Sequence, residues 1–90
     1  MSEIPVSILF FAKSAELTGI KETNISIPSS IKSVGNLLNF ILSRWPELVV
    51  LNGCFVFAIN CVYVELKDPD IELNLQSGSE IAIIPPISGG

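Results

Sequence analysis

The sequence has 90 residues with no histidine, a formal net charge of −4, and 49% hydrophobic against only 16% charged residues. This length allows one domain with a single core, the missing histidine excludes His-based acid–base catalysis, and the five scattered Lys and Arg residues argue against a nucleic-acid partner. Because about 25% of an average soluble domain is charged, we expect this chain to keep apolar surface exposed for a partner protein.

The first third of the chain predicts two strands. Residues 6–12 (VSILFFA) are rich in β-branched and aromatic side chains, which is typical of a buried strand. Residues 13–19 are more polar and end in glycine, so they predict a loop or a single helical turn. Residues 22–27 (ETNISI) alternate polar and apolar positions, which predicts a second, half-buried strand.

The next segment predicts the one main helix. Pro28, Ser29 and Ser30 form a turn whose hydroxyl groups are candidate N-caps. Five apolar residues then follow at helical spacing on one face: Ile31, Val34, Leu38, Ile41 and Trp45. Pro46 ends this helix because its ring cannot continue the backbone hydrogen bonds.

The second half of the chain predicts three more strands. Residues 55–60 form the first, residues 63–66 a short one after a tight turn at 60–61, and residues 80–84 the last after a turn at 76–79. The complete order is strand, strand, helix, strand, short strand, strand, which places two hairpins around one helix.

This order predicts an α+β fold of the ubiquitin-like β-grasp type, with a mixed sheet of four to five strands and the helix packed on one face. In this arrangement the first and last strands lie side by side and parallel at the centre of the sheet. Residues 1–84 are expected to form the domain, and residues 85–90 a flexible C-terminal tail that ends in Gly-Gly.

Other features bear on the compartment and on bound groups. The longest apolar region, residues 49–64, is interrupted by Asn and Gly and is shorter than the ~20 residues of a membrane span, so no membrane contact is expected. The N-terminus lacks the features of a signal peptide, which favours the cytosol. Cys54 and Cys61 fit neither a CxxC pair nor a zinc pattern, so we expect free, buried thiols, no metal and no permanently bound cofactor.

The last six residues, PPISGG, favour a carrier function. Pro85 and Pro86 cannot donate ladder hydrogen bonds, so the tail is expected to leave the sheet and project outward, with Ile87 available to anchor it in a groove. Gly89 and Gly90 have no side chains and can pass through a channel too narrow for a Cβ atom. The carboxylate of Gly90 could then be delivered into the active site of another protein. The alternative is a poorly ordered terminus without a function, since chain ends are commonly disordered.

Three segments resemble one known family. Residues 10–19 (FFAKSAELTG), residues 58–60 (AIN) and residues 78–90 (GSEIAIIPPISGG) are similar to the small, sulfur-carrying subunits of molybdopterin synthase, the first segment to eukaryotic members in particular. The similarity covers nearly the whole chain and is most specific at its end. Ser79 and Cys61 depart from the family pattern, in which an acidic and a polar residue are usual.

The resemblance implies that Gly90 is the residue that carries sulfur. An E1-like adenylyltransferase would adenylate its carboxylate with ATP, and a sulfurtransferase would convert it to a thiocarboxylate. This group would donate its sulfur to cyclic pyranopterin monophosphate, which forms the dithiolene of molybdopterin during molybdenum cofactor biosynthesis. A thiocarboxylate stores the sulfur covalently until the partner's site aligns the acceptor carbon.

The resemblance also implies a heterotetramer of two small and two large subunits, in which the large subunit supplies most of the catalytic residues. The tail residues inserted into the large subunit would be Pro85, Pro86, Ile87, Ser88 and Gly89. The apolar contact patch would include Phe11, Tyr63 and Ile84. From the residues alone, core packing and partner contact are equal alternatives for Phe11 and Ile84, whereas its amphipathic ring makes Tyr63 the better interface candidate.

Two other functions are compatible with the same sequence. A ubiquitin-like protein modifier or a tRNA-thiolation carrier would share the fold, the adenylation and the diglycine end, and would differ only in the final acceptor. A non-covalent adaptor domain would bind through its apolar sheet face and would not need the tail. Identifying the partner tests the first alternative, and removing Gly89 and Gly90 tests the second.

Overall fold

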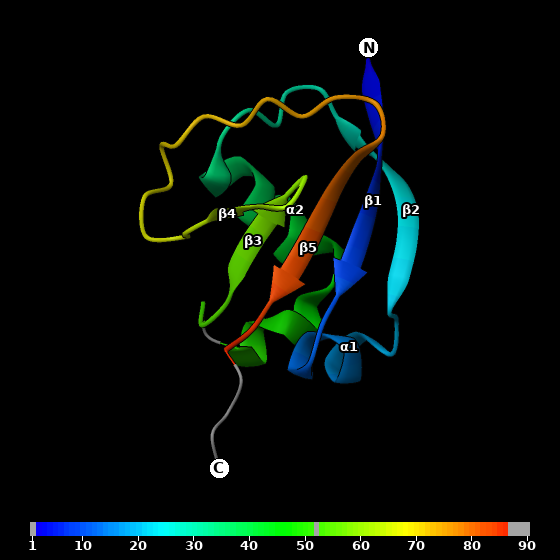
Figure 1. Cartoon of the computed structure of the whole chain (residues 1–90), viewed down its shortest axis with the longest axis vertical. Coiled ribbons are helices and arrows are strands. Elements are labelled where there is room, and N and C mark those ends of the chain that lie inside the picture. The colour runs from blue at the N-terminus through cyan, green and yellow to red at the C-terminus, as the bar shows by residue number, and fades with distance from the viewer. Residues whose placement is uncertain (1, 52, 87–90) are drawn as a thin grey trace.

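The computed structural model describes residues 2–51 and 53–86, which form one five-stranded sheet with helices against it (Figure 1). Along the chain the elements are β1 (Glu3–Phe10), α1 (Lys13–Thr18), β2 (Glu22–Pro28), α2 (Val34–Arg44), η1 (Pro46–Leu51), β3 (Val56–Ile59), β4 (Val62–Val64) and β5 (Ser79–Ile84). The predicted order of strands and main helix is confirmed, whereas the 3-10 helix η1 is absent from the sequence-based prediction. Among the described residues, no helix is both long and apolar enough to cross a membrane.

The sheet has the strand order β2-β1-β5-β3-β4. β1 and β5 pair in parallel at its centre, with Ile8 opposite Ile81, and the other neighbouring strands pair antiparallel. Two hairpins joined in this way, with one main helix across the sheet, make the β-grasp fold, so the predicted α+β class is confirmed. Both central strands run toward the end of the molecule where α1 packs against η1 (Figure 1).

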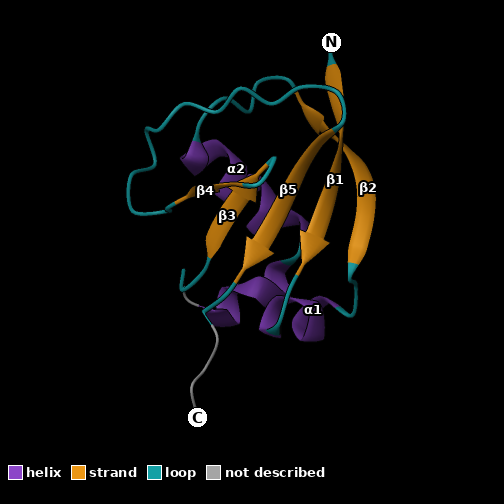
Figure 2. Ribbon diagram, in the orientation of Figure 1, coloured by secondary structure: helices purple, strands orange, loops and turns teal. Residues whose placement is uncertain are grey.

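The core lies between the sheet and α2, which covers the sheet face turned away from the viewer in Figure 2. Alternate residues of β1 point into this core, and Val6, Ile8 and Phe10 are all buried. They meet the face of α2 that carries Leu37 and Ile41, both fully buried. At roughly 25 cal/mol for each Å² of apolar surface removed from water, this layer is the main source of stability. In the described part of the chain, no helix covers the opposite face of the sheet.

Helix α2 begins later than the sequence predicts. Its N-cap is Ser33, whose hydroxyl accepts a hydrogen bond from the Asn36 amide at 3.2 Å, so the prediction of Ser29 or Ser30 as the cap is wrong. The error arises because Ile31 fits the helical spacing. Ile31 is buried in the core, but it belongs to the non-helical segment that precedes the helix. A buried apolar residue just before a helix can thus extend the apolar spacing in the sequence by one turn beyond the true helix start.

The first turn of α2 packs against the loop between β4 and β5. The amides of Val34 and Gly35 donate to the carbonyls of Ile71 and Pro69, both at 2.9 Å, so the loop satisfies donors that a free helix end leaves to water. A Cβ atom on Gly35 would lie 3.0 Å from Pro69 Cβ and 3.2 Å from the Pro69 carbonyl oxygen. The position therefore favours glycine, because a side chain here would have to push the loop outward by a few tenths of an ångström.

The Gly35→Ala variant is expected to be less stable by about 1 kcal/mol, although alanine is the better helix former by a similar amount. The new methyl group pushes the Pro69 loop outward, and overpacking of this kind costs about 1–3 kcal/mol. Thermal unfolding measures the difference. Asn39→Ala is the matched control, because Asn39 is exposed on the same helix and its replacement is expected to stabilise slightly. If Gly35→Ala gained stability as the control does, the loop contact would not constrain this position.

Candidate functional site

The uncovered face of the sheet carries a hollow over its central strands. The floor of the hollow is formed by Ala58 on β3 and Ala82 on β5, which are partners across the ladder. These alanines are 6% and 7% exposed although they lie on the outer face, because larger neighbours surround them. The hollow has a volume of about 260 Å³.

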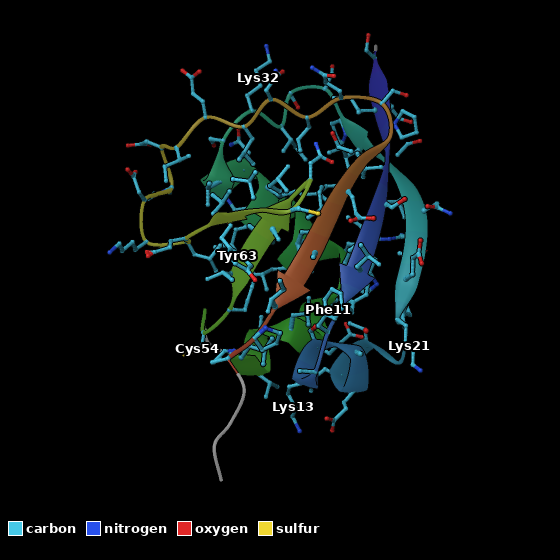
Figure 3. The ribbon with its side chains drawn as sticks, viewed as in Figure 1. Phe11, Lys13, Lys21, Lys32, Cys54 and Tyr63 are labelled. Atoms are coloured by element: carbon cyan, nitrogen blue, oxygen red, sulfur yellow. The ribbon has the colours of Figure 1, made fainter. Side chains whose placement is uncertain are left out.

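Large side chains form the walls of this hollow. Leu9 and Phe11 come from the end of β1 and the residue after it, Ile84 from the end of β5, and Tyr63 from β4. Figure 3 shows Phe11 and Tyr63 on either side of β5. Phe11 is 48% exposed, Tyr63 is 73% exposed and Ile84 is half-buried. The structure thus brings Phe11, Tyr63 and Ile84 together on one surface, and their contact with a partner stays a prediction.

A tight turn after β1 holds Phe11 at this surface. The Ser14 amide donates to the Phe11 carbonyl at 3.1 Å, which closes a four-residue turn. Ala12 is the second residue of the turn, with φ 51° and ψ −128°, a conformation that glycine adopts more easily. For a residue with a side chain such a conformation costs about 1–3 kcal/mol. The chain therefore passes from β1 almost directly into α1 and leaves Phe11 outside the core.

Ser14 connects this turn to the end of β5. Its side chain is fully buried. Its hydroxyl donates to the Phe11 carbonyl at 2.6 Å and makes a second, longer hydrogen bond to the Ile83 carbonyl at 3.3 Å. The Ile83 carbonyl accepts the Phe11 amide as well, at 3.1 Å. Because Ile83 is two residues before Pro85, this network fixes Phe11 and the start of the tail relative to each other.

A second apolar recess, of about 580 Å³, lies where the tail leaves the sheet. Tyr63 and Ile84 line both this recess and the hollow, so the two adjoin. Pro85 and Pro86 also line the recess, the first buried and the second exposed, so the chain reaches the surface shortly after β5 ends. The remaining predicted tail residues, Ile87, Ser88, Gly89 and Gly90, lie outside the described residues.

Cys54 and Cys61 are free cysteines, but the prediction that they are buried is wrong, since both are exposed. Cys54 lies in the loop before β3 and lines the recess at the tail. Cys61 belongs to the tight turn between β3 and β4, with φ 71°, and lines the hollow. Residues in such loops and turns do not face the core, which explains the error. Within residues 2–51 and 53–86, no three His, Cys, Asp or Glu side chains gather as a metal site requires.

Sequence reasoning missed three residues that shape this surface: Ala58, Ala82 and Ser14. The two alanines are small residues in strands of large apolar residues, and this is a signal only when β3 and β5 are known to be neighbours. Ser14 lies in a polar segment whose sequence does not indicate burial. Its importance follows from the two carbonyl groups that its hydroxyl meets.

Comparison with known proteins identifies the family. Residues 8–90 match the ThiS family. A human protein described as a molybdopterin synthase sulfur carrier subunit is 48% identical over 85 residues, which cover 94% of this chain and 93% of the human protein. The Aedes aegypti protein of the same description is 38% identical over 91 residues, which cover 97% of this chain and 90% of that protein.

Solved structures show the same fold at lower identity. A putative molybdopterin converting factor, subunit 1, from Pyrococcus furiosus has a TM-score of 0.71 at 24% identity, covering 93% of this chain and 99% of its own. A protein–protein complex of subunits 1 and 2 of the molybdopterin-converting factor from Helicobacter pylori contains a chain with a TM-score of 0.59 at 23% identity, covering 97% of this chain and all of its own. The chain therefore belongs to the ThiS family and groups with the molybdopterin synthase sulfur carrier subunits, as its motifs predicted.

Proposed function

We propose that this protein is the sulfur carrier of a molybdopterin synthase and that its working group is the carboxyl group of Gly90. An E1-like enzyme adenylates the carboxylate with ATP, and a sulfurtransferase then replaces the AMP with sulfur. The thiocarboxylate donates this sulfur to cyclic pyranopterin monophosphate in molybdenum cofactor biosynthesis. Membership of the family supports this function. ATP is consumed by the activating enzyme, and the carrier itself holds no permanent cofactor.

The observation that best supports the proposal is the place where the tail begins. β5 is a central strand with β1 on one side and β3 on the other, so the tail has a rigid base. The recess beside Pro85 and Pro86 adjoins the exposed rings of the outer face. Four residues beyond Pro86 extend at most about 14 Å, so an enzyme that acts on Gly90 must approach this surface. A carrier needs such a combination of a firm contact surface and a reactive group that reaches past it.

The partner that holds the domain is, in this proposal, the large subunit of molybdopterin synthase. The Helicobacter pylori structure is a complex of subunits 1 and 2 of its own molybdopterin-converting factor, which supports a two-subunit assembly. Phe11, Tyr63 and Ile84 contact the large subunit, and residues 85–89 enter its pocket. The assembly is a cytosolic heterotetramer of two small and two large subunits, with most catalytic residues on the large one.

Intact-mass spectrometry tests this function. After incubation with the E1-like enzyme, ATP and a sulfur donor, the protein is expected to gain one sulfur in place of one oxygen. A variant that lacks Gly89 and Gly90 is expected to show no such gain. Loaded protein mixed with the large subunit and the pterin precursor should return to its original mass as molybdopterin forms. Conjugates to lysine side chains would instead identify a protein modifier, and full activity without the two glycines would identify an adaptor.

A further inference from the structure

We propose that the open edge of β2 binds an extended segment of a partner protein, and that this segment carries apolar residues and an acidic residue on one face. The inference goes beyond the proposed function and does not depend on the sulfur chemistry. β2 forms one edge of the sheet, and β1 separates it from β5, the strand that the tail follows (Figure 1). A segment bound at this edge therefore leaves the tail and the rings of the outer face free.

The edge of β2 presents backbone groups that no other strand bonds. In an antiparallel pair, hydrogen-bonded and non-hydrogen-bonded residue pairs alternate. The Phe10 amide donates to the Lys21 carbonyl directly before β2, so the odd-numbered residues of β2 bond to β1. Asn24 and Ser26 therefore direct their amides and carbonyls away from β1. These backbone groups have no hydrogen-bond partner in the portion of the chain that the structure describes.

The middle of β2 lacks the features that usually prevent an edge strand from pairing with another chain. Such features include a charged residue, a proline or a bulge along the edge. In β2, the one charged residue, Glu22, and the one proline, Pro28, stand at the two ends of the strand. The register with β1 is continuous across all the paired residues, without a bulge. The central residues can therefore accept an extended segment through ladder hydrogen bonds.

A groove lies beside this edge, between β2 and α2. It has a volume of about 470 Å³ and is lined by Asn24, Ile25 and Ser26 of β2 and by Phe40 and Arg44 of α2. Ile25 and Phe40 are half-buried, so they offer apolar surface on the α2 side of the edge. Alternate residues of an added strand point to that side. Every second residue of the occupant is therefore expected to be apolar where it meets Ile25 and Phe40.

Arg44 provides the charge that selects the occupant. It is the one charged residue of α2 and of the groove lining, it is exposed, and it forms no salt bridge with the residues that the structure describes. Its guanidinium carbon lies 5.9 Å from the centroid of the buried Trp45 ring, which favours a fixed position. A carboxylate of the occupant can form a charge-assisted, bidentate pair with this guanidinium group.

A second copy of this chain does not meet these requirements. If the β2 edges of two copies paired, each would offer Thr23, Ile25 and Ile27 on the α2 side, because these residues share the sheet face that α2 covers. Glu22, the one acidic residue of β2, lies on the opposite face and does not approach Arg44 from that side. The occupant is therefore a segment of a different protein, with an acidic residue among apolar ones.

A synthetic peptide tests the inference. It has seven residues, with valine at the third and fifth positions, glutamate at both ends and threonine elsewhere, so the valines and glutamates share one face in either chain direction. Nuclear magnetic resonance of the full-length protein measures hydrogen exchange. The Asn24 and Ser26 amides are expected to exchange freely without peptide, and about 10-fold more slowly with peptide at about ten times its Kd. The Ile25 amide, which bonds to β1, is expected to be protected in both states.

The Arg44→Glu variant tests the charge of the groove. It is expected to bind the peptide about 10-fold more weakly or worse, because an attraction becomes a repulsion. The same variant is expected to prefer a peptide with lysine in place of both glutamates. Lys32→Glu is the matched control, since it makes the same charge change outside the groove, before the first residue of α2. About 15 Å of helix separates the two positions, more than the screening length of about 8–10 Å, so normal affinity is expected.

Unchanged exchange of the Asn24 and Ser26 amides at saturating peptide would overturn the inference. Equal affinities of Arg44→Glu and Lys32→Glu would do the same, as would peptide-induced shifts confined to Phe11 and Tyr63 on the outer face. A peptide N-methylated at its five central residues cannot donate ladder hydrogen bonds, and full binding by this peptide would also contradict pairing at the edge. None of these measurements involves sulfur, so their failure leaves the carrier function standing.

Discussion

A protein with one alanine added after Gly90 is expected to lose sulfur transfer completely, while its fold and its affinity for the large subunit change little. The addition converts the carboxyl group of Gly90 into a peptide bond, so ATP has no group to activate at that position. The new carboxyl group lies about 3.5 Å further along the chain and on a residue with a Cβ atom, which a channel fitted to glycine excludes. The fold is unaffected because β5 ends at Ile84, before the tail.

Two measurements follow the two steps of this prediction. Intact-mass spectrometry reports sulfur uptake, and molybdopterin formation with the large subunit reports sulfur transfer. Ser88→Ala is the matched control, because it alters the same tail without changing its length, and it is expected to retain both steps. Transfer at the normal rate by the extended protein would show that the carboxyl group of Gly90 is not the working group.

Much of the fold is predictable from local patterns. The apolar runs around Ile8 and Ile81 indicate central strands, and the alternation in residues 22–27 indicates a strand with one face in water. The parallel central pair then follows from the order of the elements, because the helix must connect two hairpins across one face. The helix start is not predictable in this way, since Ile31 has the spacing of a helical residue and only the hydrogen bond to Ser33 shows where the helix begins.

The candidate site is predictable only in part, because distant segments assemble it. Phe10 and Phe11 are chemically identical neighbours, yet Phe10 is 3% exposed and Phe11 is 48% exposed. The alternation of β1 turns Phe10 toward the core and Phe11 toward the outer face. The turn at Ala12, which is held by hydrogen bonds from Ser14 to the Phe11 and Ile83 carbonyls, then keeps Phe11 at that surface. No local pattern contains the bond to Ile83. The tail motif is different, since its residues are contiguous and its chemistry depends on their order alone.

Replacing both Phe11 and Tyr63 with alanine is expected to weaken binding of the large subunit by about 100-fold or more without unfolding the domain. The two rings are walls of the hollow and are 48% and 73% exposed, so their removal takes away contact surface and little of the core. Exposed substitutions usually change stability by less than about 0.5 kcal/mol each. Calorimetric titration with the large subunit measures the affinity, and thermal unfolding measures the stability.

The Phe57→Ala variant is the control for this last prediction, because it removes an aromatic ring from the other face of the sheet. Phe57 is fully buried and packs edge to face on Phe55, with ring centroids 5.7 Å apart. Its loss is expected to cost about 3–5 kcal/mol, a large fraction of the roughly 5–15 kcal/mol that stabilises a domain, while the folded fraction still binds the large subunit. If the double variant instead melts as early as Phe57→Ala, or binds as tightly as the unchanged protein, the exposed rings support the fold and do not hold the partner.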